Sequence, residues 1–563
     1  MIRTIDSGRL RWISIVALGW MIGDWPSGAM GQEGSPSVPQ ASALPRAAVS
    51  PSDAHQELLD RLLKMEQRLD QVTKRNEELS REVQELRAVN RDQSQQFPAV
   101  PVATRFNTTR AGGTASFSQP SAGGGSKTSG GDPTTTGRAQ EIGNPHLGKL
   151  GIKTYYDFDN DGFGFSTQDE EFTLDVRALS QLDARIYQQQ NQFPVSSGFY
   201  NPRTRVYFEG RLTKPIQYEF SFQNTFDTVA LLDAYLNFNY DPRFQLRIGR
   251  YKTPFTYEWY RIHVWHLLAP ERSLFANNYE GNRRFGLMGW GSMFEQRMEY
   301  AVGTFNGQRN SYQPYDSHQD VMAFLNFKPF YNREEGFLLR DIQVGGSVDA
   351  GNENQPTVPA VLRTNSAPAA EGVTSSGAAN SASLPFLAFN PNVSERGLRA
   401  LWELHAAYYY GGLTLLGAWQ GGYESYALGT TGSPTRIPIG GWFAQAGYIL
   451  TGETLRDRTL IEPLRPFDLR RDRFGLGAFE VTARYSELEL SRRVFTAGLA
   501  DPNLWTNHTQ MVDVGLNWYL NKSVKIYFDW EHAIFGNPVV YNTNTGRRSF
   551  HSDLYWLRFQ FYF

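Results

Sequence analysis

The chain of 563 residues contains no cysteine, few lysines and almost no net charge. The absence of cysteine excludes a disulfide scaffold, a cysteine-ligated zinc site and an iron–sulfur cluster. A net charge of −2 provides no general attraction for nucleic acid. Only ten of the 55 basic residues are lysine, so arginine supplies most of the positive charge.

Long apolar segments are also absent. After the N-terminal region, no segment has the run of about eighteen apolar residues that a membrane-spanning helix requires. Aromatic residues nevertheless make up 14% of the chain, while the mean hydropathy is −0.46. A transmembrane barrel explains this combination, because it needs aromatic side chains at the lipid interface and polar side chains in its lumen. The HExxH, GxSxG and P-loop motifs are missing, and we expect no enzyme activity, no cofactor and no metal site.

The N-terminus has the pattern of an export signal. Arg3, Arg9 and Arg11 precede an apolar run from Trp12 to Ile22, and small residues follow at positions 29 and 31. Residues 1–31 therefore read as a signal peptide, with a short membrane anchor as the alternative. The Pro-, Ser- and Ala-rich residues 32–52 are expected to be disordered.

A heptad pattern predicts a coiled coil over residues 53–92, which we expect in the periplasm. Apolar residues and two asparagines alternate at spacings of four and three: Leu58, Leu62, Met65, Leu69, Val72, Asn76, Leu79, Val83, Leu86 and Asn90. The mixed a positions leave two or three strands open, but either number implies a homo-oligomer. Residues 93–145 are rich in Gly, Ser and Thr and form a linker.

From residue 146 onward the apolar and polar residues alternate with period two. One example is the segment 508–520, in which Val512, Val514 and Leu516 alternate with Asp513 and Gly515. Such runs of about ten residues fit tilted strands that cross a membrane. Short turns and longer polar loops separate the runs in turn, as in bacterial outer-membrane barrels. We predict a hairpin over 146–171 and an all-β transmembrane barrel of about sixteen antiparallel strands over 172–563.

Several segments of the barrel region resemble the phosphate-selective porins O and P. They are 205–210 (RVYFEG), 246–255 (LRIGRYKTPF), 449–453 (ILTGE), 477–485 (GAFEVTARY), 514–520 (VGLNWYL) and 557–561 (LRFQF). The resemblance implies a trimeric sixteen-stranded barrel in the bacterial outer membrane. It also implies a third extracellular loop, here 253–283, that folds inward and narrows the pore. A homotrimer in contact with outer-membrane lipid, without nucleic acid, is the assembly that we expect.

The candidate site residues follow from this resemblance and from strand parity, the rule that alternate residues of a strand face opposite sides of the barrel wall. Parity places these arginines in the lumen: Arg177, Arg185, Arg205, Arg211, Arg247, Arg484 and Arg558. The resemblance places Arg205, Tyr207 and Asp233 near the selectivity zone. Within and beside the inward loop, candidates for the constriction are Lys252, Arg261, Arg272, Arg283 and Arg284. Basic side chains lower the barrier for anions, and the planar donors of arginine match phosphate oxygens. The expected function is passive diffusion of small solutes, with a preference for small anions such as phosphate.

Several alternatives remain open. Lumen-facing carboxylates such as Glu209 and Glu219 would partly neutralise the arginines, and the shortage of lysine weakens the expectation of phosphate selectivity. Aromatic residues of the inward loop could bind sugars, although packing against the wall is the favoured interpretation. An envelope tether, in which the coiled coil contacts the cell wall and the barrel is mainly an anchor, is the alternative function.

Overall fold

The structure is a computed structural model, and it describes residues 140–141, 151–157, 162–189, 191–225, 228–279, 282–307, 309–310, 312–355, 358–365, 382–429 and 431–563. The predicted signal peptide, disordered segment, coiled coil and most of the linker lie outside these residues. In the described part of the chain, no helix combines the length and the apolar character needed to cross a membrane.

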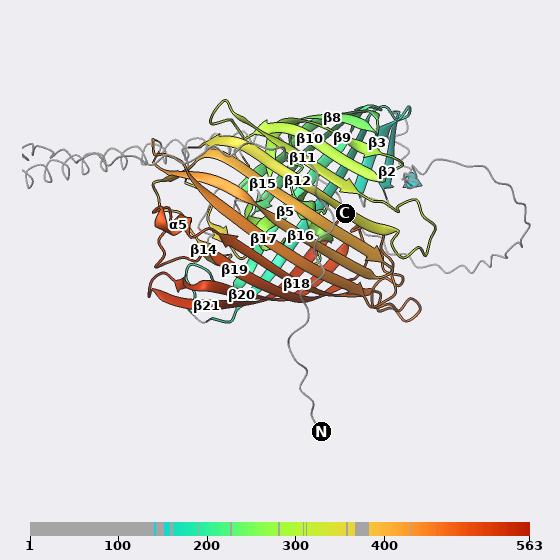
Figure 1. The fold of residues 1–563 in the computed structure, drawn as a ribbon. Coiled ribbons are helices and arrows are strands. Elements are labelled where there is room, and N and C mark those ends of the chain that lie inside the picture. Colours follow the sequence, from blue (N-terminus) through green and yellow to red (C-terminus); the bar gives the residue numbers. More distant parts are fainter. Residues whose placement is uncertain are drawn as a thin grey trace, which may run out of the picture. The chain divides into compact units, whose positions relative to one another are not determined.

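Sixteen long antiparallel strands form the body of the molecule (Figure 1). They are β4 (Thr173–Tyr187), β5 (Gly198–Thr213), β6 (Ile216–Thr225), β7 (Thr228–Asp241), β8 (Phe244–Lys252), β9 (Arg283–Met293), β10 (Met298–Asn306), β11 (Gln319–Phe327), β12 (Asp341–Asn354), β15 (Val393–Tyr410), β16 (Leu413–Leu428), β17 (Thr435–Ile449), β18 (Ala478–Leu490), β19 (His508–Tyr519), β20 (Val524–Asn542) and β21 (Arg547–Tyr562).

The barrel closes between its first and last strands. β21 pairs with β4 from Leu554 opposite Tyr187 to Tyr562 opposite Leu179. Each of the other strands pairs with its neighbours in chain order, so none of the sixteen is left as an open edge. The predicted all-β transmembrane barrel of sixteen strands is therefore confirmed. Closure satisfies the backbone donors and acceptors that lipid would otherwise leave unpaired.

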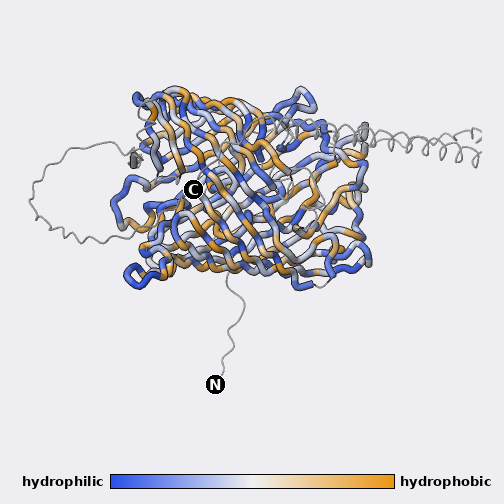
Figure 2. The backbone as a smooth tube through the Cα atoms, turned by 180° about the vertical axis from the view of Figure 1, so that it is seen from behind, coloured by the Kyte–Doolittle hydropathy of each residue, from blue (hydrophilic) through white to orange (hydrophobic). Residues whose placement is uncertain are grey.

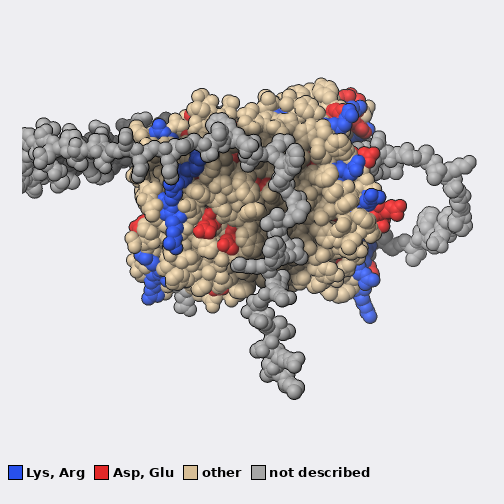
Figure 3. Space-filling view, viewed as in Figure 1, with Lys and Arg blue, Asp and Glu red and all other residues tan. Residues whose placement is uncertain are grey.

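The period-two pattern sorts side chains as expected. Outward-facing Val302, Leu404 and Phe559 are about half-exposed, at 52%, 56% and 46%. Their lumen-facing neighbours, such as Arg558 and Gln560, are buried among other lumen residues. Figure 2 shows the alternation of hydropathy along the strands. On the face in Figure 3, lysines and arginines gather toward the two ends of the barrel, and the surface between them is mostly uncharged.

Several strands are longer than the apolar pattern indicates. We expected strands at 412–421 and 523–534, but β16 extends to Leu428 and β20 extends to Asn542. The extensions lie at the end of the barrel that carries the longer loops. Hairpin pairing continues there because backbone hydrogen bonds do not depend on apolar side chains. The hydropathy pattern therefore marks the membrane-spanning part of each strand and misses the rest of it.

Three short strands precede the barrel. β1 (Gln140–Glu141) pairs with β2 (Ile152–Asp157), β2 pairs with β3 (Gly162–Thr167), and β3 pairs with the beginning of β4. β3 thus uses the part of the β4 edge that β21 does not reach. Residues 158–161, between β2 and β3, lie outside the described residues.

Loops fill much of the lumen. The connection between β8 and β9, residues 253–282, is called the inward loop below and contains α2 (Tyr257–Tyr260), η2 (Val264–His266) and α3 (Leu274–Tyr279). The connection between β12 and β15 contains the small hairpin of β13 (Leu362–Arg363) and β14 (Pro385–Leu387), and α5 (Arg493–Thr496) follows β18. Apolar residues of these loops, including Leu274, Phe386, Phe389 and Val494, join one buried cluster.

Candidate anion site in the lumen

A cavity of about 860 Å³ lies between the barrel wall and the inward loop. Five of the predicted site residues reach it from strands: Arg177, Arg205, Tyr207, Asp233 and Arg247. Four more reach it from the inward loop or the strand ends beside it: Lys252, Arg261, Arg272 and Arg283. The tertiary fold thus brings together nine residues that the sequence separates by more than a hundred positions.

The cavity wall carries more positive than negative charge. Seven lysine and arginine side chains line it, against the four carboxylates of Glu209, Glu219, Asp233 and Glu299. Charges of one sign in a confined, low-dielectric passage raise the local concentration of ions of the opposite sign. The lysine and arginine side chains outnumber the carboxylates in the lining of the cavity.

The densest positive charge surrounds the ring of Trp259. The guanidinium of Arg272 lies 4.6 Å from the ring centroid, the Lys252 ammonium lies 5.3 Å away, and the guanidinium of Arg283 lies 5.5 Å away. These three cations around Trp259 are called the basic cluster below. The Trp259 side chain is buried, and its indole N–H has no hydrogen-bond partner among the described residues.

Local structure explains how Trp259 reaches this position. Thr256 caps α2, because its side-chain oxygen accepts a hydrogen bond from the backbone N–H of Trp259 at 3.3 Å. The backbone N–H of Thr256 donates to Ser347 on β12 at 3.0 Å. The short helix is therefore fixed to β12 of the barrel wall, and its Trp259 ring lies among the three cations of the basic cluster.

Asp233 acts on the basic cluster as an orienting group. Its carboxylate accepts a hydrogen bond from Arg283 Nε at 2.9 Å and another from Ser221 Oγ at 2.7 Å. One carboxylate among three cations leaves the cluster positive. Asp233 therefore holds Arg283 in place without cancelling the charge that an anion would meet.

Other cavity residues have distinct partners. Arg247 lies over aromatic rings, with its guanidinium 4.3 Å from the centroid of Tyr235 and 4.8 Å from that of Trp290. Arg177 pairs with Glu209 and donates a hydrogen bond to the Tyr562 hydroxyl at 3.0 Å. The edge of the Tyr207 ring meets Trp265, with centroids 5.9 Å apart.

The other five predicted site residues do not line this cavity. Arg558 belongs to the ion-pair network described next, and the remaining four lie elsewhere in the barrel. Arg185 is buried against Asp183, and Arg484 pairs with Asp513 at 2.9 and 3.0 Å. Arg284, which follows Arg283 on β9, is buried between Asp320 of β11 and Asp349 of β12. Arg211 lies near the end of β5, opposite Thr173 and Gln217. All four are arginines of barrel strands, but their surroundings differ from those of the basic cluster.

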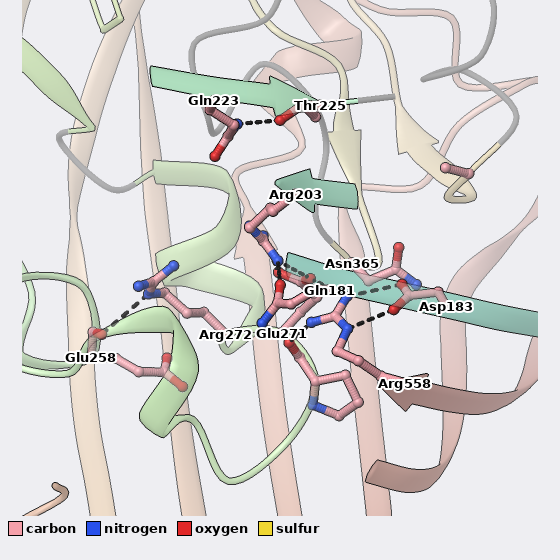
Figure 4. Close-up of polar contacts among 12 residues, drawn as sticks. Gln181, Asp183, Arg203, Gln223, Thr225, Glu258, Glu271, Arg272, Asn365 and Arg558 are labelled. Atoms are coloured by element: carbon pink, nitrogen blue, oxygen red, sulfur yellow. Dashed lines mark hydrogen bonds and ion pairs between the residues drawn. The ribbon is translucent and has the colours of Figure 1, made fainter. Parts of the chain in front are cut away.

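The inward loop is fastened by a buried ion-pair network, of which sequence reasoning identified only Arg558 as facing the lumen (Figure 4). Glu271 accepts two hydrogen bonds from Arg203 at 2.6 Å and one from Arg558 at 2.8 Å. Arg558 also pairs with Asp183, at 2.6 and 2.9 Å. We call Arg203, Glu271, Arg558 and Asp183 the loop anchor. The sequence alone gives no signal that separates Glu271 from Glu258 and Glu280, the other acidic residues of this loop.

A second connection enters the lumen from the opposite end of the barrel. Asp457 of the segment between β17 and β18 pairs with Arg261 of the inward loop at 2.5 Å. The next residue, Arg458, pairs with Glu480 and donates to the His266 carbonyl at 3.1 Å. Thr459 and Leu460 of this connection line the cavity. The passage is therefore narrowed from both ends.

Part of the sequence matches a known protein family. Residues 375–563 match the model of the phosphate-selective porin O and P family. No curated protein matches the sequence.

Among the solved structures that match this chain are three outer-membrane proteins. A trimer form of OmpT from Vibrio cholerae gives a TM-score of 0.41 at 8% identity over 70% of this chain and 100% of that one. An anion-selective porin from Comamonas acidovorans gives 0.39 at 10% identity over 70% and 100%. The outer-membrane channel DcaP of Acinetobacter baumannii gives 0.41 at 9% identity over 71% and 99%.

The closed sixteen-stranded barrel, with its polar lumen and its family match, defines an outer-membrane porin. Its residues 375–563 match the phosphate-selective porin O and P family, the family that its sequence motifs resemble.

Proposed function

We propose that this porin conducts small anions in preference to cations. The observation that carries the proposal is the basic cluster, where three cations and one carboxylate meet at the wall of the cavity. Arginine and lysine offer several N–H donors there, and hydrogen bonds between charged partners are stronger than neutral ones. An anion that loses part of its hydration shell in the passage would regain hydrogen bonds from these side chains.

Phosphate is one anion that such a cluster fits. The two guanidinium groups, of Arg272 and Arg283, can each present paired N–H donors to phosphate oxygens. Lysines are scarce, with only Lys252 at the cavity, so a preference for small anions in general is the function that the geometry favours. Phosphate selectivity is the narrower form of the same proposal.

We also propose a homotrimer in the outer membrane, with the N-terminal coiled coil in the periplasm. The heptad over residues 53–92 supports self-association. This segment, on which the tether alternative and its cell-wall contact also depend, lies outside the described residues.

The proposal is tested by the reversal potential of the full-length protein in a planar bilayer under a tenfold KCl gradient. We expect a reversal potential whose sign shows that chloride permeates more readily than potassium. The preference should shrink near 1 M salt, because the screening length falls from about 10 Å at 0.1 M to about 3 Å at 1 M. The same gradient in potassium phosphate tests the narrower form. A reversal potential of the opposite sign at low salt would contradict the proposal.

Variants connect the preference to the cavity. Arg205→Gln and Arg247→Gln remove cavity charges and should each lower the permeability ratio of chloride to potassium. Arg470→Gln is the matched control, because Arg470 is exposed outside the cavity and pairs with Asp468. If the control lowers the ratio as much as the cavity variants do, the preference does not arise at this site.

A further inference from the structure

The wall of the cavity is aromatic as well as basic. Rings of tyrosine and tryptophan line it from both the barrel and the inward loop, including Tyr207, Tyr235, Tyr260, Trp265 and Trp290. Passage of an inorganic anion requires charge and hydrogen-bond donors but no aromatic surface. The rings therefore need a separate explanation, which is either packing of the loop or contact with a permeating solute.

The rings of His263, Trp265 and Tyr562 form a stack, and all three residues line the cavity. His263 stacks on Trp265 with centroids 4.5 Å apart and planes inclined by 16°. Trp265 stacks in turn on Tyr562 of β21, at 4.7 Å and 13°. Both faces of Trp265 are thus covered, and its position is explained by packing of the loop against the wall.

His263, at the end of the stack, differs from the other two rings. It is exposed, although residues on both sides of it, Ile262 and Val264, are buried. One face of its imidazole covers Trp265, and the residue lines the cavity. Loop packing does not account for a ring that the fold leaves open to the passage.

The exposed ring lies directly beside the basic cluster. The carbonyl of Ile262 accepts hydrogen bonds from Lys252 Nζ at 3.3 Å and from Arg272 at 3.4 Å. His263 is the next residue in the chain. Two members of the basic cluster and the free end of the ring stack are therefore held together by one short stretch of backbone.

We propose that the cavity binds aromatic carboxylates, with the carboxylate at the basic cluster and the ring extending the stack beyond His263. This inference rests on the proposed anion preference, because both use Lys252, Arg272 and Arg283. A flat ring stacks offset on the imidazole as the tryptophan does on its other face. A saturated ring of the same size lacks the flat π surface, and a small carboxylate lacks the ring altogether.

The test compares three carboxylates as blockers of the chloride current through the full-length protein in a planar bilayer. The probes are benzoate, cyclohexanecarboxylate and acetate, which share one charge. We expect the half-blocking concentration of benzoate to be roughly three- to tenfold lower than that of acetate. This difference corresponds to the free energy of one aromatic contact. Cyclohexanecarboxylate should lie closer to acetate. Equal block by all three, or by benzoate and cyclohexanecarboxylate, would overturn the proposal.

Variants locate the contact. His263→Ala should remove most of the advantage of benzoate over acetate and leave block by acetate unchanged, because the cations remain. His318→Ala, an exposed histidine of the loop between β10 and β11, is the matched control and should leave the advantage intact. A benzoate advantage that survives His263→Ala overturns the proposed contact. If the reversal potential of the unmodified protein shows no anion preference, the proposed function fails first and this inference fails with it.

Discussion

The partners of each arginine determine its part in this lumen. Arg558 and Arg484 face inward, as strand parity predicts, yet both are fully engaged with carboxylates. Arg272 instead lies over the Trp259 ring and donates to backbone carbonyls of its own loop. A guanidinium that is neutralised by a buried carboxylate is structural, whereas one that shares its surroundings with other cations keeps a field that an anion can meet.

Two substitutions in the basic cluster should shift ion preference in opposite directions. Arg272→Gln removes a cation and should lower the chloride-to-potassium permeability ratio. Asp233→Asn removes the orienting carboxylate and should raise that ratio. Because the lumen is wet, one charge at contact distance is worth about 0.5–1 kcal/mol, or roughly a two- to fivefold change in the ratio. Reversal potentials measured at 0.1 M KCl report both effects. If the two variants shift the permeability ratio in the same direction, the substitutions act by disturbing the fold and not through their charge.

At the scale of the element, ion pairs fix the inward loop at two points, Glu271 and Arg261. The loop anchor fastens Glu271 to β5 and β21 through Arg203 and Arg558. On the other side, Arg261 pairs with Glu299 on β10 and with Asp457 from the opposite end of the barrel. The cavity keeps its dimensions only while this loop stays in place, so the ion pairs set the width of the passage indirectly.

Removing the charge of Glu271 should loosen the loop. Glu271→Gln leaves Arg203 and Arg558 short of a buried carboxylate, and breaking such a pair typically costs about 3–5 kcal/mol. We expect larger or fluctuating single-channel conductance, measured in planar bilayers, with the barrel still folded because its strand pairing is untouched.

The control for this variant is Asp468→Asn, which removes an exposed ion pair with Arg470. Exposed pairs contribute little, and this variant should conduct as the unmodified protein does. The double variant Glu271→Gln with Arg203→Gln should recover part of the steady conductance, since it leaves fewer unpaired cations. A steady, unchanged conductance in Glu271→Gln alone would mean that the anchor does not hold the loop.

At the scale of the whole molecule, closure depends on the described barrel alone. β4 and β21 meet through backbone pairing and through the side chains of Gln181 and Gln560, whose amides are hydrogen-bonded at 2.8 Å. All strands that close the barrel lie between Thr173 and Tyr562. The barrel should therefore form without the heptad region.

Deleting residues 53–145 should leave the single-channel conductance unchanged. The expected change is in assembly, because the heptad no longer supports association: less trimer should survive dilution in detergent. Light scattering after size-exclusion chromatography measures the mass, and bilayer recordings measure the conductance. Loss of the folded barrel on this deletion would contradict the separation of the two regions.

The strand pattern was predictable because it reflects a local rule. Alternate residues of a strand face opposite sides, and lipid selects apolar side chains on one of them. The period-two spacing of Val512, Val514 and Leu516 therefore predicts β19 without any information on the neighbouring strands. The same rule puts Arg177, Arg205 and Arg247 in the lumen, and all three line the cavity.

The sequence by itself determined the kind of protein, since period-two strands, short turns and family motifs are all local features of the chain. Only the tertiary structure decided which inward-facing arginines meet a carboxylate and which gather around Trp259. Glu271 and Asp457 have no local signal for their partners, because Arg558 and Arg261 lie 287 and 196 positions away along the chain. Contacts across a lumen depend on where the loops enter it, and no periodicity along a single strand records that.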